Sequence, residues 1–166
     1  MKFVLVDRIS ELEPGRRIVA HKSVSLAEEY LADHFPTFPV LPGVFMLEAL
    51  VQASAWVVRS GLDFKPSIVV LKDARNVTYK SFIAPGRTLN IESTCKELAP
   101  EMSVFQAAGS VDGREIVKGK LTLRHLSLAD SDASMASIDD GIRSKMRQLF
   151  GLLQLGRPRE AAATGG

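Results

Sequence analysis

The sequence predicts an α+β domain in which one long central helix is wrapped by an antiparallel sheet of five or six strands, with a further helix appended at the C-terminus. Three observations support this prediction. The segment after Pro42 is apolar around most of a helix circumference, which is typical of a buried helix. Stretches on both sides of it alternate apolar and polar residues, as strands do. Turn residues such as Pro14-Gly15 and Pro85-Gly86 separate these stretches.

The N-terminal elements are a hairpin and a short helix. The hairpin turns at Pro14-Gly15, between two alternating stretches. The helix is expected over residues 25–32, because Ser25 and Glu28 have the spacing of a capping box. Three prolines then fix the backbone of residues 34–42, which predicts a stiff loop without regular structure.

The central helix is expected to begin at Pro42-Gly43 and to run to about Ser60. Gly61 follows at the position where a left-handed residue often ends a helix. Four strands are expected beyond it, in SIVVLKDARNVTYK, TLNIESTCKE, SVFQAAGSVD and REIVKGKLTLRHL. A single sheet of this kind leaves an apolar helix and an edge strand to cover, which favours dimerisation.

The chain is expected to form one domain over residues 1–128, followed by a linker, a short amphipathic helix and a disordered tail over residues 129–166. Ser137 is the expected cap of the helix. Its apolar stripe is Ile138, Ile142, Met146, Leu149 and Leu153, opposite Arg143, Lys145 and Arg147. Packing on the domain or on a neighbouring subunit is the main expectation, and docking to a membrane surface or an anionic partner is the alternative.

Composition excludes several classes of protein. With 166 residues, 46% of them hydrophobic, the chain can build one sizeable core. A net charge of +2 is too small for a nucleic-acid reader. Cys95 is the only cysteine, so an intramolecular disulfide is impossible and a thiolate metal site is not expected. Because the sequence has neither a secretory signal nor a transmembrane run, a cytoplasmic location is expected.

The three histidines differ in their surroundings. His21 and His125 lie in predicted strands without acidic or nucleophilic neighbours, and both are expected to be structural. His34 lies in the loop that the prolines fix, which suits a site that needs a preorganised base. A surface turn is the alternative explanation for His34.

Glu48 lies inside the apolar central helix, where a carboxylate without a partner is costly to desolvate. Its charged form should be disfavoured there, so we expect Glu48 to stay protonated and to act as a general acid. The backbone amides of Gly43 and Val44 stand at the positive end of the same helix and could stabilise a developing oxyanion.

The stretch HFPTFPVLPGVFMLEALVQ closely resembles the signature of the 3-hydroxyacyl-acyl carrier protein dehydratases of type II fatty acid synthesis, which have the hot-dog fold. That signature is H-F-P-x-x-P-x-x-P-G-V followed by E-A-x-x-Q. The matched positions are His34, Phe35, Pro36, Pro39, Pro42, Gly43, Val44, Glu48, Ala49 and Gln52. The likeness covers about residues 3–126.

The resemblance implies dehydration of a 3-hydroxyacyl-acyl carrier protein to the trans-2-enoyl product, with neither metal nor organic cofactor. It implies that His34 removes the proton α to the thioester carbonyl and that Glu48 protonates the departing hydroxyl. The Gly43 amide would hold the carbonyl oxygen, and Phe35 and Val44 would contribute to substrate binding. In this family the histidine and the glutamate meet across a dimer interface, so the implied partners are acyl carrier protein and a second copy of the chain.

Some positions depart from the residues that relatives often carry. Asp33, Thr37 and Arg87 are such departures, and they bear on carrier docking and substrate preference. A sister family that also isomerises its product carries Asp where Glu48 stands, so Glu48 favours simple dehydration.

Two other functions remain open at the level of sequence. One is a hot-dog acyl thioesterase, in which a carboxylate on the central helix serves the attack of water. The other is a non-catalytic acyl-binding dimer. The acyl chain length depends on how side chains such as Phe45, Trp56 and Phe82 pack around the tunnel.

Overall fold

The structure is a computed structural model that describes residues 3–33 and 37–155. Its elements in chain order are β1 (Arg8–Glu13), β2 (Arg17–Ser23), α1 (Tyr30–Asp33), α2 (Gly43–Gly61), β3 (Ile68–Tyr79), β4 (Thr88–Leu98), β5 (Met102–Val111), β6 (Arg114–Leu126) and α3 (Ala136–Leu153). Two short 3-10 turns, Leu128–Asp130 and Ala133–Met135, connect β6 to α3.

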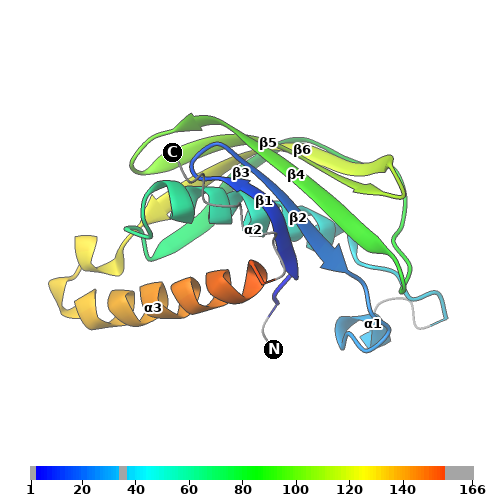
Figure 1. Cartoon of the computed structure of the whole chain (residues 1–166), viewed down its shortest axis with the longest axis horizontal. Helices are drawn as coiled ribbons and strands as arrows, with labels where there is room; N and C mark the ends of the chain where they lie inside the picture. The colour runs from blue at the N-terminus through cyan, green and yellow to red at the C-terminus, as the bar shows by residue number, and fades with distance from the viewer. Residues whose placement is uncertain (1–2, 34–36, 156–166) are drawn as a thin grey trace, which may run out of the picture.

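The strands form one six-stranded antiparallel sheet in the order β1-β2-β4-β5-β6-β3. Figure 1 shows the sheet curving over α2, with α3 beneath α2 on the side opposite the sheet. This arrangement confirms the predicted α+β fold with a central helix, six strands and an added C-terminal helix. β1 and β3 form the two edges of the sheet, and β3 reaches its place beside β6 by crossing over from α2.

The core lies between α2 and the concave face of the sheet. Leu50 and Val57 of α2 are fully buried, as are Ile91, Phe105 and Leu121 of the strands. Each side chain of this size contributes about 1.5–3 kcal/mol when it is fully buried. The apolar pattern that predicted α2 therefore reflects the helix's enclosure, and its predicted span agrees with the structure.

Helix α1 is shorter than the predicted helix over residues 25–32, since it covers only Tyr30–Asp33. The expected capping box is wrong. Glu28 instead accepts a hydrogen bond from the Lys22 ammonium at 2.6 Å, and Lys22 is buried. An unpaired buried charge costs more than a missing helix cap, so the pairing with Lys22 determines where Glu28 lies.

Gly61 ends α2, but not as a left-handed cap. It does not have a positive φ, and Leu62 follows it as the cap with φ −103°. Gly61 instead packs against the β1–β2 turn, because a Cβ at this position would lie 2.5 Å from the Cα of Gly15. Gly15 has φ +72° and donates its amide to the Val57 carbonyl at 3.1 Å. Both glycines are therefore needed for the close approach of helix and hairpin.

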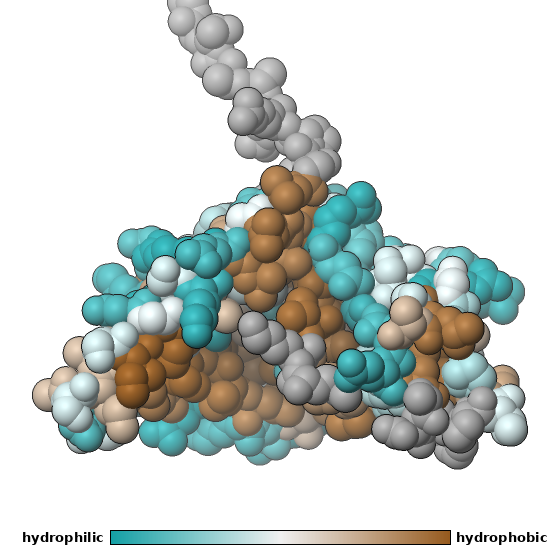
Figure 2. All heavy atoms as spheres, turned by 90° about the horizontal axis from the view of Figure 1, so that it is seen from below, coloured by the Kyte–Doolittle hydropathy of each residue, from teal (hydrophilic) through white to brown (hydrophobic). Residues whose placement is uncertain are grey.

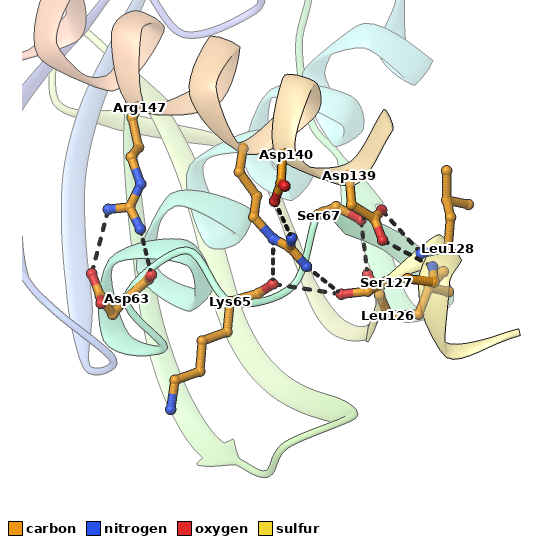
Figure 3. A network of polar contacts seen from close by, with 11 residues as sticks. Asp63, Lys65, Ser67, Leu126, Ser127, Leu128, Asp139, Asp140 and Arg147 are labelled. Carbon is orange, nitrogen blue, oxygen red and sulfur yellow. Dashed lines mark hydrogen bonds and ion pairs between the residues drawn. The ribbon is translucent and has the colours of Figure 1, made fainter. Parts of the chain in front are cut away.

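Helix α3 is anchored to the domain at its first turns by Asp139, whose side chain is fully buried (Figure 3). The carboxylate accepts hydrogen bonds from Ser67 Oγ and from the amides of Leu128, at 3.0 Å, and Ala129, at 2.9 Å. Burial alone would raise the pKa of Asp139, but these hydrogen bonds outweigh it and hold the pKa below its usual value. Ser137 was expected to cap the helix, but the N-cap is Met135.

Two arginines extend this anchor along α3 (Figure 3). Arg143 donates to the Lys65 carbonyl at 2.8 Å and to Ser127 Oγ at 2.9 Å. Arg147 donates to the Asp63 carbonyl at 2.9 Å, and its guanidinium lies 4.7 Å from the centroid of the Phe64 ring. The helix therefore packs on its own domain, as expected, and these two cations serve that packing. In residues 3–33 and 37–155, no helix is long and apolar enough to span a bilayer.

Replacing Gly61 by alanine should destabilise the fold, because the new Cβ would collide with the Gly15 backbone. We expect the free energy of unfolding to fall by about 1–3 kcal/mol, the usual cost of overpacking. Gly141→Ala is the matched control, since a Cβ there meets nothing within 4 Å and alanine favours the helix by about 0.5–1 kcal/mol. Urea denaturation of both variants measures the difference, and equal stability would contradict the proposed contact.

Replacing Asp139 by alanine should loosen α3, because one hydroxyl and two amides lose their acceptor. Hydrogen exchange in residues 136–153 should rise, whereas Asp140→Ala should raise it much less, because the Asp140 side chain is exposed and pairs, among the described residues, only with the Arg143 side chain. Since the folded pKa is depressed, the contribution of Asp139 is present above its unfolded pKa of about 3.9 and is lost as the pH falls through the lower folded value. In the wild type, the protection of the α3 amides from hydrogen exchange should therefore fall only below about pH 3.9. The alanine variant should show no such fall with pH.

Candidate functional site

A groove of about 850 Å³ runs between α2 and α3, and Glu48 lies in its wall. Its apolar lining comes from Val51, Ala55 and Trp56 of α2 and from Met146, Leu149 and Leu152 of α3. Seen from below, on the face away from the sheet, the molecule shows a band of hydrophobic surface between hydrophilic margins (Figure 2). An open apolar groove beside a carboxylate is the kind of site that accepts an aliphatic ligand.

Glu48 is half-buried at the groove and does not lie in the closed core that its apolar surroundings predicted. Its Oε1 accepts a hydrogen bond from Gln52 Nε2 at 3.0 Å. Within the described residues, Oε2 has no hydrogen-bond partner. One carboxylate oxygen is therefore held in place while the other is available to a ligand.

Gln52 positions Glu48 and also fixes the N-terminal segment. Its Nε2 donates to the Phe3 carbonyl at 3.0 Å, and its Oε1 accepts from the Leu5 amide at 2.9 Å. Sequence reasoning included Gln52 only as a matched position and gave it no role. The spacing of four residues from Glu48 could have predicted this contact, since residues i and i+4 of a helix lie side by side.

Gly43 begins α2, with Pro42 as the N-cap and no acidic residue in the first turn. A Cβ at Gly43 would lie 3.5 Å from the ring of Tyr79, so the helix start packs against the end of β3. Val44 is 63% exposed. The first amides of the helix lie at the positive end of its dipole, as the sequence predicted.

Gly43 and Glu48 do not lie on the same face of α2. Five residues of α-helix correspond to a rotation of about 140° and a rise of about 7.5 Å. A rigid helix cannot remove that rotation. In one chain the expected oxyanion donor and the expected acid are therefore separated both along and around α2.

His34 and Phe35 lie outside the described residues, which end at Asp33 and resume at Thr37. The described part of the proline loop, residues 37–42, has no regular structure, as expected. Leu41 is buried and donates its amide to the Ile83 carbonyl at 2.8 Å. The loop is therefore fixed to the domain where it enters α2.

The other two histidines are structural, as predicted. His21 is within hydrogen-bond distance of Asn90 Oδ1, at 2.8 Å, and of Ser10 Oγ, at 2.9 Å. His125 is buried, and its Nε2 lies 2.8 Å from Ser103 Oγ. Burial lowers the pKa of His125, so its ring is neutral at neutral pH.

The aromatic residues expected around a tunnel lie in three different places. Trp56 lines the groove and stacks on Phe150 of α3, with ring centroids 5.6 Å apart. Phe45 packs edge-on against Tyr30 instead. Phe82 is 67% exposed and contacts the ring of another exposed phenylalanine. Only Trp56 is thus placed to meet a ligand in this groove.

Arg59 is a groove residue that sequence reasoning missed. Its side chain is only 9% exposed, and its Nη1 donates to the Ser67 carbonyl at 3.1 Å. Burial lowers the pKa of the guanidinium to about 10, so it remains a cation at neutral pH. The sequence did contain one indication of this position, because Arg59 is a charged residue on a helix that is otherwise mostly apolar. Among the described residues, no cluster of His, Cys, Asp and Glu could hold a metal ion.

Comparison with known proteins places this architecture in a family. The FabA-like domain family matches residues 1–120. The 3-hydroxyacyl-acyl-carrier-protein dehydratase FabZ of Clostridium kluyveri is 32% identical over 119 residues, 72% of this chain and 83% of that protein. The protein of the same name from Ruminiclostridium cellulolyticum is 36% identical over 121 residues, 72% of this chain and 84% of that protein.

Solved structures share the fold at lower identity. The dehydratase heterocomplex ApeI:P from Xenorhabdus doucetiae matches with a TM-score of 0.64 and 20% identity, over 80% of this chain and 90% of that one. A hypothetical thioesterase from Streptococcus pneumoniae with coenzyme A matches with a TM-score of 0.54 and 15% identity, over 72% and 85% of the two chains. These two matches show the fold alone. The family match over residues 1–120 and the identity to the dehydratase relatives show more than the fold. They show that the chain belongs to the FabA-like domain family.

Proposed function

We propose that this protein is a 3-hydroxyacyl-acyl carrier protein dehydratase of fatty acid or related lipid synthesis, and that it works in the cytoplasm without a cofactor. The main support for the proposal is the position of the Glu48 carboxylate, which Gln52 holds in the wall of an apolar groove. Relatives named for this activity, about a third identical over most of the chain, support it.

In the proposed reaction, His34 takes the proton α to the thioester carbonyl, and the electron pair moves towards the carbonyl oxygen. The Gly43 amide stabilises the enolate character at that oxygen. The bond from C3 to the hydroxyl breaks as Glu48 delivers a proton, and water leaves. The new double bond lies between C2 and C3, and proton exchange with solvent restores His34 and Glu48. Phe35 and Val44 contact the substrate next to the thioester.

The site is proposed to be shared between two copies of the chain. The separation of Gly43 from Glu48 along and around α2 supports this, because a second copy could place its own Glu48 or Gly43 closer to the missing partner. β3 is an edge strand with exposed Val70, Leu71 and Tyr79, so it offers a surface on which another strand could pair. Acyl carrier protein is the proposed partner that delivers the substrate.

His34→Ala and Glu48→Gln should each reduce the dehydration rate by at least about 10²-fold, because each removes one proton-transfer group. The assay follows the ultraviolet absorbance of the conjugated enoyl group formed from a 3-hydroxyacyl-carrier thioester. Glu101→Gln is the control, since Glu101 is an exposed carboxylate outside the groove. Release of free thiol without enoyl product would indicate a thioesterase. Binding without turnover would indicate an acyl-binding dimer.

Co-expression of the His34→Ala and Glu48→Gln chains tests the shared site. Random pairing makes about half of the dimers mixed, and each mixed dimer has one site in which both residues are intact. Activity should therefore return to about a quarter of the wild-type value. If each chain held its own complete site, the mixture would stay as inactive as the two single variants.

A further inference from the structure

Two cations, Arg59 and Lys145, line the same groove as Glu48. Neither forms an ion pair within residues 3–33 and 37–155, and the one hydrogen bond of the Arg59 side chain there goes to the Ser67 carbonyl. A buried guanidinium without an anion is costly to desolvate. A ligand that brings an anion to this place would recover much of that cost.

The cations lie at the opposite end of the groove from the acid. Arg59 follows Glu48 by eleven residues, which is about 16 Å along α2 and only about 20° around it, so both face the groove. α3 runs antiparallel to α2, because Arg147 contacts Asp63 while Phe150 stacks on Trp56. Lys145 therefore lies towards the Arg59 end.

The middle of the groove is apolar. Val51, Ala55 and Trp56 face Met146 and Leu149 across it. Trp56 and Gln148 are the lining residues of this stretch that carry hydrogen-bonding groups, and a ligand with several amides there, such as a pantetheine arm, would leave some of its polar groups unsatisfied. A hydrocarbon chain suits this stretch.

We propose that the groove binds an acyl chain whose far end carries a carboxylate, held by Arg59 and Lys145. The position of the thioester end at Glu48 rests on the proposed function, whereas the anion subsite rests on the groove alone. An extended chain gains about 3.3–3.6 Å per three bonds, so the span of about 16 Å corresponds to roughly fourteen bonds. Charge-assisted hydrogen bonds from Arg59 to the carboxylate would give the selectivity.

The second cation comes from a part of the chain that the family match does not cover. The match ends at residue 120, and α3 begins at Ala136. α3 supplies Lys145 and one apolar wall of the groove. The proposed subsite therefore combines Arg59, which lies within the matched residues, with Lys145, which lies beyond them.

Binding can be measured without catalysis, because Trp56 is the only tryptophan and lies in the groove. Its fluorescence should report sodium dodecanoate binding at least about tenfold more tightly than 1-dodecanol, with the difference shrinking at high salt. Arg59→Met and Lys145→Ala should each reduce that preference. Arg59→Lys should retain part of it. Lys96→Ala, an exposed lysine outside the groove, should not change it.

Catalysis provides the second readout. For 3-hydroxyacyl-carrier substrates of equal length, kcat/KM should be higher with a terminal carboxylate than with a terminal methyl group. Lys145→Ala should lower the former by a larger factor than the latter. Equal binding of dodecanoate and dodecanol would overturn the proposal. So would an Arg59→Met variant that changes the mass of the oligomer in light scattering but keeps the preference, because a second copy's carboxylate would then be the partner of Arg59.

The dehydratase function and the anion subsite can be disproved independently of each other. If no substrate is dehydrated but dodecanoate binds through Arg59, the proposed function is wrong and the anion subsite stands. If both substrate types are dehydrated with equal kcat/KM and dodecanoate has no advantage, the subsite is wrong and the dehydratase stands.

Discussion

The arrangement of this protein depends on the enclosure of α2 between the sheet and α3. A polar group buried without a partner costs about 1–3 kcal/mol, so each polar side chain on this helix has to be satisfied. Ser54 bonds to Ser93 of the sheet at 2.7 Å, Gln52 bonds to the N-terminal backbone, and Arg59 bonds to the Ser67 carbonyl. Glu48 keeps one oxygen on the groove. The helix that fills the core thus also presents the carboxylate that is proposed to act as the acid.

The same enclosure bears on the proposal that two copies of the chain share one site. The angle of about 140° between Gly43 and Glu48 is set by helix geometry, and the packing of α2 holds both residues in fixed positions relative to the sheet. The contact of Gly15 with Gly61 fixes one end of the helix, and Gly43 packs against Tyr79 at the other. A second chain is the simplest source of the missing groups, and the edge strand β3 offers a place for it to pair.

Periodicity was enough to predict the architecture, because the alternation of strands and the span of α2 are set by local sequence. Local rules failed where a distant residue competed. Gly61 meets Gly15 instead of forming a left-handed cap, and Glu28 pairs with Lys22 instead of capping a helix. The position of Glu48 was predicted on the correct helix but in a closed core, since the groove depends on where α3 packs. No sequence pattern contains that information.

Two sides of α3 have different roles, since one holds the helix to the domain and the other lines the groove. Asp139, Arg143 and Arg147 recur every four residues and hold the helix to the domain. Lys145 and Leu149 also stand four residues apart, on another side, and line the groove. Met146 and Leu149 of this side also pack against the core, but Lys145 takes no part in the polar anchoring contacts. A substitution of Lys145 would therefore alter the groove while α3 stays docked. A change at Lys145 would therefore alter the proposed ligand preference while Glu48 and the helix that carries it stay in place.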